Sequence, residues 1–203
     1  MGGQATFWFE LASTYSYLSA ARVDDLAAQR GIEVAWRPFL LGPIFAAQGW
    51  STSPFRLQPA KGRYMWRDMA RLTAARGLPF TVPDGPAMDL FPQHSVLAAR
   101  LALVGLAEGW GKAFVRAVFE AGFAQWQDIA APATLAPLIR RVGGEPEMAL
   151  TAAVAPEIKQ ALRANTEAAQ AAGIFGAPSV TVGEELFWGD DRLEAALNLA
   201  AER

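Results

Sequence analysis

Cysteine is absent from this chain of 203 residues, and histidine occurs once, as His94. The absence of cysteine excludes disulfide bonds, thiol redox chemistry by the protein itself and metal sites built from thiolates. A single histidine cannot form a cluster of histidine ligands, and no partner motif near His94 indicates a catalytic triad. We therefore expect no bound metal and interpret His94 as a structural or exposed residue.

Basic runs and long apolar stretches are also lacking. The 18 Lys and Arg residues are scattered among 20 Asp and Glu residues, for a net charge of −2, which does not fit a nucleic-acid-binding surface. The opening MGGQATFWFE has no basic region followed by a long apolar core, and charged residues interrupt the Ala-rich segments short of membrane-spanning length. We expect a cytoplasmic protein that contacts neither nucleic acid nor membrane.

Apolar residues, in contrast, make up 52% of the chain, which is enough to bury one sizeable core. The aromatic run FWF at residues 7–9 is typical of a strand buried on both faces, predicted over residues 6–11. Helical spacing of apolar residues predicts a helix over residues 15–30, and alternation predicts a strand over residues 32–38. A helical crossover between two strands implies that they pair in parallel.

The rest of the chain is mostly helical in pattern. Residues 40–62 mix glycine, proline, serine and threonine with aromatics, which predicts a long loop or an interrupted helix. Helical periodicity then predicts a block of helices over residues 64–76, 93–108, 112–125 and 134–141. The C-terminal part predicts a helix, a hairpin and a final helix over residues 158–172, 179–188 and 191–202. Within the hairpin, we expect Trp188 to pack against the sheet.

Two short segments in this pattern each allow two interpretations. Ser13-Thr14-Tyr15-Ser16 stands where the first strand passes into a helix, so it is either a plain helix cap or an anion site. From these residues alone the cap is favoured. Pro178 precedes the hairpin, and it either enters an edge strand as a trans residue or holds Ala177 open to a ligand in a cis turn.

The order β-α-β, helices, then α-β-β-α, with a proline entering the hairpin, resembles the thioredoxin fold. Thioredoxin-like oxidoreductases carry Cys-x-x-Cys where this chain has Ser13-Thr14-Tyr15-Ser16, so dithiol chemistry is excluded. Over essentially the whole chain, four segments resemble the 2-hydroxychromene-2-carboxylate isomerase family and the related kappa-class glutathione transferases: FELASTYSYL, PAKGRYMWRD, GIFGAPSV and LFWGDDRLE. Thr14 departs from the proline usual in the family, which predicts a less rigid helix start.

This resemblance implies an α/β fold with a DsbA-like arrangement. Residues 1–40 and 155–203 would form a thioredoxin-like domain that carries the glutathione site, and residues 41–154 would form an all-helical insertion domain. The resemblance also implies a cis peptide bond before Pro178 and, as is common in relatives, a homodimer.

The resemblance further implies that glutathione binds as a cofactor. Ser13 would be the catalytic residue, donating its hydroxyl hydrogen to the glutathione sulfur so that thiolate is favoured over thiol. The backbone of Ala177, exposed by Pro178, would pair with the cysteinyl backbone of glutathione. The other implied contacts are Asp191 with the γ-glutamyl ammonium, Asp190 and first-turn amides with its carboxylate, Lys61 with the glycyl carboxylate or an acidic substrate, and Thr52 with glutathione.

Several of these residues also have plain structural interpretations. Asp190 and Asp191 fit the cap of the last helix, and Lys61 fits a solvated surface charge. A set of aromatic residues fits either an aromatic substrate pocket or part of the core: Trp50, Phe55, Tyr64 and Trp66.

The function implied by the resemblance is glutathione-dependent isomerisation of 2-hydroxychromene-2-carboxylate or a similar small aromatic carboxylate. Thiolate addition, ring opening, bond rotation and elimination would return glutathione with a changed alkene geometry. A kappa-like glutathione transferase would share the addition but release the conjugate. A non-catalytic binding protein with a thioredoxin fold would use Ser13 only as a cap, and the sequence leaves these alternatives open.

Overall fold

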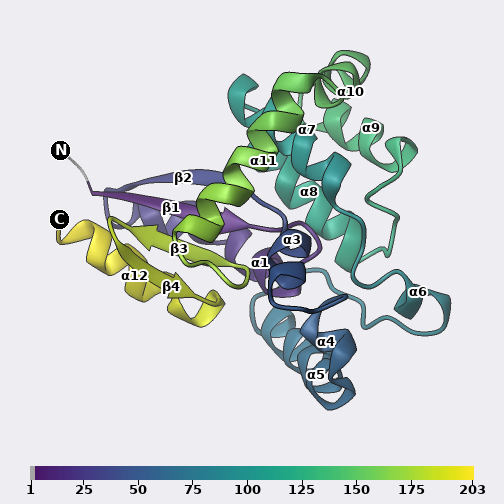
Figure 1. Ribbon diagram of the computed structural model, residues 1–203, viewed down its shortest axis with the longest axis horizontal. Helices are drawn as coiled ribbons and strands as arrows, with labels where there is room; N and C mark the ends of the chain where they lie inside the picture. The colour runs from purple at the N-terminus through teal and green to yellow at the C-terminus, as the bar shows by residue number, and fades with distance from the viewer. Residues whose placement is uncertain (1–2) are drawn as a thin grey trace.

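The computed structural model describes residues 3–203 and is built around a mixed four-stranded sheet (Figure 1). The strands are β1 (Gln4–Phe9), β2 (Glu33–Pro38), β3 (Ser179–Val182) and β4 (Glu185–Trp188). Their spatial order is β2-β1-β3-β4, with β1 parallel to β2 and antiparallel to β3. The parallel pair and the C-terminal hairpin are those that the sequence predicted.

Helices surround this sheet and form most of the chain between β2 and β3 (Figure 1). They are α1 (Thr14–Ala20), α2 (Val23–Ala28), α3 (Leu41–Ala47), α4 (Pro54–Leu57), α5 (Pro59–Ala75), α6 (Pro86–Asp89), α7 (Val96–Glu108), α8 (Gly111–Phe123), α9 (Pro132–Arg141), α10 (Pro146–Ala153), α11 (Pro156–Ala171) and α12 (Leu193–Ala201), with a 3-10 turn, η1 (Asp190–Arg192), before α12. Residues 40–62 form an interrupted helix, because α3 ends at Ala47 and proline restarts a helix at α4 and again at α5.

Strand β1 lies inside the sheet because its side chains are apolar on both faces. Phe7 and Phe9 are fully buried against Trp36 of β2, with ring centroids 5.0 and 5.5 Å apart. Trp8 points to the opposite face, where its ring lies 6.3 Å from that of Phe39. Full burial of such a side chain contributes on the order of 2 kcal/mol, so the FWF run is a main source of the stability of the sheet.

The single helix predicted over residues 15–30 is in fact two helices, α1 and α2. The break falls at Arg22, whose φ of −131° is not helical. Arg22 pairs with Asp190 at 3.3 Å and with Glu194 at 2.7 Å. Because these partners lie near the other end of the chain, the local sequence gives no signal for the break. The first strand, predicted over residues 6–11, also ends earlier, at Phe9.

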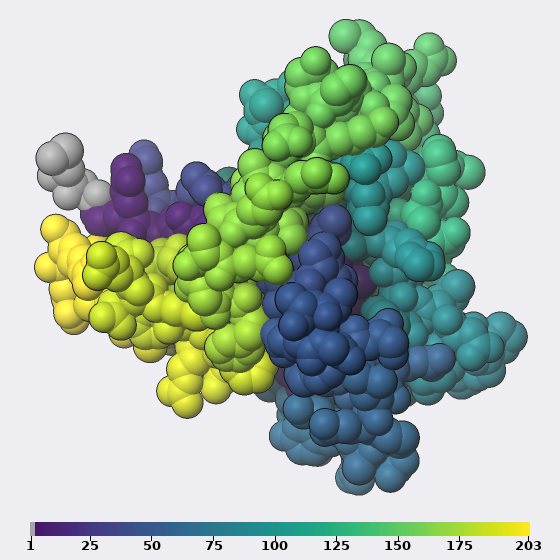
Figure 2. Space-filling view, in the orientation of Figure 1, coloured from purple at the N-terminus to yellow at the C-terminus, as the bar shows by residue number. Residues whose placement is uncertain are grey.

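The main apolar core joins the sheet to the helical block. It includes Phe9 of β1, Tyr17 of α1 and Phe119 of α8, and the rings of Tyr17 and Phe119 stack at 5.8 Å. Figure 2 shows α11, in green, lying across the front of the molecule with the dark-blue atoms of α3 beside it. A second, smaller cluster of buried residues includes one residue of each of these helices and one of β1. Its members are Trp8, Phe39, Ile44, Ala169 and Ile174.

The proposed division into two domains remains a prediction. The main core contains residues from both of its parts, residues 1–40 with 155–203 and residues 41–154. Within residues 3–203, no helix is both long and apolar enough to cross a membrane. In that same part of the chain, no three His, Asp or Glu side chains are grouped so that they could hold a metal ion.

The prediction that Trp188 packs against the sheet is wrong. Its side chain is 52% exposed and lies against Phe175, with ring centroids 4.9 Å apart. It also covers the backbone of Gly176, where an added Cβ would come within 2.4 Å of the Trp188 Nε1 atom. The physical reason is position: Trp188 ends β4, which is an edge strand and pairs only with β3.

Candidate active site

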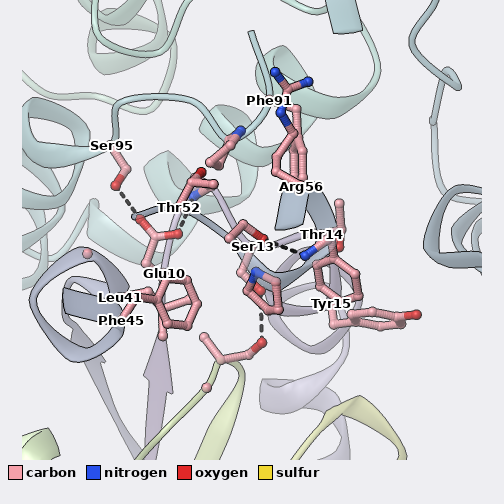
Figure 3. A pocket seen from close by; sticks show the side chains of 18 of the residues that line it. Glu10, Ser13, Thr14, Tyr15, Leu41, Phe45, Thr52, Arg56, Phe91 and Ser95 are labelled. Carbon is pink, nitrogen blue, oxygen red and sulfur yellow. Dashed lines mark hydrogen bonds between the residues drawn. The ribbon is translucent and has the colours of Figure 1, made fainter. Parts of the chain in front are cut away.

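A cavity of about 1520 Å³ opens where β1 ends and α1 begins. Its walls come from the segment between β1 and α1, the region of α3 to α5, the segment before α7, the turn that precedes β3, and the turn from the end of β4 through η1. Figure 3 shows Glu10, Ser13 and Tyr15 along this cavity, with Thr52 and Arg56 from the α3-to-α4 region. Six of the seven predicted glutathione-binding residues line it: Ser13, Thr52, Lys61, Ala177, Asp190 and Asp191.

The Ser13 hydroxyl makes two hydrogen bonds within the protein. As the N-cap of α1, its Oγ accepts a hydrogen bond from the Ser16 N–H at 3.2 Å. The same hydroxyl donates to the carbonyl oxygen of Ala177 at 2.9 Å, across 164 positions of sequence. The start of α1 and the turn before β3 are therefore in direct contact at the cavity wall.

The peptide bond between Ala177 and Pro178 is cis, as the resemblance implies. Ala177 is half-buried and lines the cavity, whereas Pro178 is buried behind it and does not line the cavity. The Pro178 carbonyl accepts a hydrogen bond from the Gly189 N–H at 2.9 Å, which ties this turn to the start of η1. Pro178 thus acts through the shape of the turn that presents Ala177.

The two neighbouring aspartates face different surroundings. Asp191 is exposed, with 74% of its side chain accessible, and among residues 3–203 its carboxylate has one ion pair, to Arg192 at 3.5 Å. Asp190 is 5% exposed, and both of its carboxylate oxygens have protein partners. Those partners are Ser19 Oγ at 2.9 Å, Arg22 Nε at 3.3 Å and Arg76 Nη2 at 2.6 Å. Asp191 is therefore free to meet a ligand, while Asp190 holds three parts of the fold together.

Lys61 and Thr52 also line the cavity, from a part of the sequence far from Asp190 and Asp191. Lys61 is exposed in the first turn of α5, and Thr52 is half-buried in the segment before α4. Neither side chain has a hydrogen-bond partner within residues 3–203. Both are thus available to a ligand, and their contact with glutathione remains a prediction.

The aromatic set divides between the cavity and the core. Trp50, Phe55 and Tyr64 line the cavity, and Trp50 and Tyr64 are partly exposed. Trp66 is buried in the main core, where its ring lies 4.8 Å from that of Phe91. His94 is exposed at the cavity, in agreement with its interpretation as an exposed residue.

Thr14 and Tyr15 fasten the start of α1 to α5. Thr14, which replaces the family proline, is buried and its hydroxyl donates to Met65 Sδ at 3.3 Å. The Tyr15 hydroxyl donates to Asp68 Oδ2 at 3.0 Å. Burial, and then the charge of Asp68, raise the pKa of Tyr15 well above its usual range, so this phenol stays protonated. These two bonds join the start of α1 to α5, and the lower rigidity expected from Thr14 remains a prediction.

Glu10 and Ser95 are the site residues that sequence reasoning missed. Both are buried and line the cavity, and the Ser95 hydroxyl donates to Glu10 Oε1. Burial raises the pKa of Glu10 to about 7. The sequence does offer one signal for Glu10, because an acidic residue directly after an apolar strand is unusual. Its hydrogen-bond partner Ser95, however, lies 85 positions away, so the burial of Glu10 could not be inferred from the neighbouring residues.

This arrangement can hold an anion or a polar peptide at the start of α1. The Ser13 hydroxyl is a donor, the end of the helix adds positive potential, and the Ala177 carbonyl is an acceptor. The exposed carboxylate of Asp191 and the exposed ammonium of Lys61 offer opposite charges to an elongated zwitterion. The aromatic residues on the wall suit a flat apolar group.

Comparison with known proteins extends over nearly the whole chain. The chain is 27% identical to a 2-hydroxychromene-2-carboxylate isomerase of Sphingobium xenophagum, over 93% of each chain. It is also 27% identical to glutathione S-transferase kappa 1 of Homo sapiens, over 97% of this chain and 90% of that protein. A solved structure of a 2-hydroxychromene-2-carboxylate isomerase has the same fold, with a TM-score of 0.83, 22% identity, and coverage of 98% and 95%.

One protein-family model matches nearly the whole chain. The model for the DSBA-like thioredoxin domain matches residues 4–200, from the start of β1 to the last turn of α12. The match includes the helices between β2 and β3 as well as the sheet, so it covers the cavity and all of its walls. The chain therefore belongs to the family of DSBA-like thioredoxin domains.

Proposed function

We propose that the protein is a glutathione-dependent isomerase of 2-hydroxychromene-2-carboxylate or a similar small aromatic carboxylate. Two relatives support the reaction class, since one is named as this isomerase and the other as a kappa glutathione transferase. Without cysteine, the chain has no thiol of its own, so the sulfur nucleophile must be brought in by a bound molecule. When bound, glutathione would supply a thiolate that adds to a conjugated carbon and leaves again after bond rotation.

The groups that line the cavity fit glutathione. Ser13 and Ala177 offer a hydroxyl and a backbone carbonyl to the cysteinyl part, in the manner of an added strand. Asp191 offers a carboxylate to the γ-glutamyl ammonium, and Lys61 offers an ammonium to the glycyl carboxylate. Asp190 contributes by holding the turn in place through Arg22 and Arg76, because its own oxygens are already engaged.

One observation carries the proposal: the 2.9 Å hydrogen bond from Ser13 Oγ to the carbonyl of Ala177. If the Ser13 hydroxyl rotates toward a bound sulfur, the same motion frees the Ala177 carbonyl to accept from the backbone of the ligand. Two contacts with glutathione therefore follow from one side-chain rotation. A hydroxyl bonded to a charged acceptor is worth ~1.5 to 3 kcal/mol, more than the neutral bond it replaces.

The experiment is a calorimetric titration of the protein with reduced glutathione up to millimolar concentration, followed by assay with the chromene carboxylate. An isomerase changes the alkene geometry of the substrate while the amount of free glutathione stays constant. Absence of binding at millimolar glutathione would contradict the proposal and favour a non-catalytic binding protein in which Ser13 is only a helix cap.

A kappa-like glutathione transferase is the second candidate, because the human kappa transferase is as similar in identity as the isomerase. Ser13 would favour the same thiolate in both reactions, so the residues of the cavity do not separate them. Consumption of one glutathione for each product molecule would identify the transferase.

A further inference from the structure

Glu10 is a buried acidic side chain at the cavity for which the proposed reaction has so far no use. It directly follows β1, and 6% of its surface is exposed. Glu10 Oε1 accepts the hydroxyl hydrogen of Ser95, and Glu10 Oε2 accepts the Ala12 N–H at 2.8 Å. Both Glu10 and Ser95 line the cavity, and Figure 3 shows the two side chains turned toward each other.

The backbone of Glu10 also holds the turn that carries Ser13. The Glu10 carbonyl accepts a hydrogen bond from the Ser13 N–H at 3.0 Å, and the Glu10 N–H donates to Ser16 Oγ at 3.4 Å. The carboxyl group and the Ser13 hydroxyl therefore belong to one short, hydrogen-bonded turn. A molecule bound beside Ser13 lies in the same cavity as the carboxyl group.

Glu10 can change its charge near neutral pH. Burial raises the pKa of Glu10 to about 7, although the hydrogen bonds from Ser95 and Ala12 oppose this. No ion pair joins Glu10 to a cation in the part of the chain that the structure describes. The other charged or titratable acidic, basic and histidine side chains that line the cavity make no bond to its carboxylate: Arg56, Lys61, Asp68, Arg76, Asp89, His94, Asp190, Asp191 and Arg192.

We propose that Glu10 accepts the proton that the thiol of glutathione loses when it binds beside Ser13, with the Ser95 hydroxyl connecting the carboxylate to the cavity. This inference rests on the proposed function. In the step, the S–H bond breaks, the sulfur keeps the electron pair, and an O–H bond forms on Glu10. When glutathione leaves as a thiol, Glu10 returns the proton, so no other acid or base is needed.

A proton acceptor within the cavity keeps the net charge of the cavity constant when the thiolate forms. Transfer of the proton to Glu10 moves one negative charge from the carboxylate to the sulfur, so the total charge in the cavity does not change. Ser13 then stabilises the charge at its new place, while Glu10 becomes the neutral form that its buried surroundings favour. Release of the proton to water would instead leave two negative groups in one cavity.

The test counts protons when reduced glutathione binds at about pH 8, where a carboxyl group with a pKa near neutrality is mostly charged. Calorimetry in two buffers with different ionisation enthalpies gives the protons released per glutathione bound. Ultraviolet absorbance gives the thiolate formed. S-methylglutathione, which has no thiol proton, is the matched ligand control, and Glu194→Gln, an exposed acid outside the cavity, is the matched protein control.

We expect the unmodified protein and Glu194→Gln to release far less than one proton per thiolate formed. Glu10→Gln should release about one proton per thiolate, because the amide cannot take it up. Glu10→Asp, which keeps a titratable carboxyl group, should restore a ratio below one. S-methylglutathione should release no proton in any of these proteins.

Three results would overturn the inference. A ratio of about one proton per thiolate in the unmodified protein would do so whether or not Glu10→Gln folds. Equal ratios in the unmodified protein and in a folded Glu10→Gln variant would assign Glu10 to a structural role, with the proposed function intact. Failure of the unmodified protein to bind glutathione would overturn the proposed function, and the inference with it.

Discussion

At the scale of single residues, the Ser13 hydroxyl separates a helix cap from a group that favours a thiolate. If this hydroxyl bonds to a bound thiolate with ~1.5 to 3 kcal/mol, Ser13→Ala should raise the pKa of the bound thiol by roughly one to two units. Turnover near neutral pH should fall with the thiolate fraction, while glutathione affinity changes less because other contacts persist. The measurement is a titration of the thiolate absorbance of bound glutathione.

Ser53→Ala is the matched control for Ser13→Ala. Ser53 caps α4, where its side chain accepts from the Phe55 N–H at 3.3 Å, but it makes no bond to Ala177. Each variant should lose about 1 kcal/mol of stability with its cap. Should the thiol of bound glutathione titrate at the same pH in both variants, Ser13 would be a cap and nothing more.

Asp191 is exposed and free to bind the γ-glutamyl ammonium, so its charge should matter for affinity. Asp191→Asn should raise the dissociation constant of glutathione by about tenfold or more, because a charge-assisted bond worth ~1.5 to 3 kcal/mol is weakened. Calorimetry measures the constant. Glu194→Gln, the same charge change in the first turn of α12, should leave it unchanged, and equal affinities of both variants would return Asp191 to a capping role.

The burial of Glu10 predicts how stability depends on pH. Its pKa rises from 4.5 to about 7 on folding, so the folded state binds more protons than the unfolded state between these values. The free energy of unfolding should therefore fall as pH rises through this window, by up to about 3 kcal/mol. Urea unfolding at about pH 5 and about pH 8 should show this loss in the unmodified protein and not in Glu10→Gln. Parallel pH profiles would contradict the shift.

Individual residues also mark the limit of what the sequence could predict about the site. Ser13, Ala177 and Asp191 sit in motifs, so a resemblance could assign them roles before their positions were known. Glu10 also stands in the segment FELASTYSYL but was given no role there, and Ser95 lies outside the four segments. The importance of these two residues comes from their mutual burial. The resemblance assigned Asp190 to the γ-glutamyl carboxylate, and it could not show that the fold engages both oxygens of this side chain.

At the scale of elements, Asp190 links the break between α1 and α2, the end of α5 and the start of η1. Removing a buried carboxylate leaves Arg22 and Arg76 without their partner, so Asp190→Ala should lower the free energy of unfolding by about 3 to 5 kcal/mol. Denaturant unfolding measures the loss. Asp191→Ala, next to it and exposed, should change stability little, and a loss below about 1 kcal/mol in Asp190→Ala would contradict the linking role.

The elements that could be predicted are those whose periodicity reflects burial. The FWF strand, the alternating β2 and the C-terminal hairpin follow from apolar patterns that the core then uses. The break at Arg22 could not be predicted, because ion pairs with η1 and α12 hold it rather than glycine or proline. Trp188 was misplaced for a related reason, since a strand pattern does not say which strand lies at the edge.

At the scale of the whole molecule, the shared core predicts that the chain unfolds as one unit. Phe119 of α8 packs against Tyr17 of α1 inside the cluster that also contains β1. Circular dichroism and tryptophan fluorescence should therefore give coincident unfolding curves. Phe119→Ala should shift both curves together, by about 3 to 5 kcal/mol for a lost aromatic side chain. Two separated transitions would instead support independent domains.

The strand order has a consequence for the chain while it is still being made on the ribosome. Strand β1 is synthesised early and can pair with β2 soon afterwards, but its other neighbour, β3, is not available until residues 179–182 have emerged. During the intervening synthesis, one edge of a strand that carries Phe7, Trp8 and Phe9 has no partner, which is the kind of edge that invites aggregation. The nascent chain therefore needs shelter for this edge, from its own helices or from a chaperone, until its last hairpin is complete.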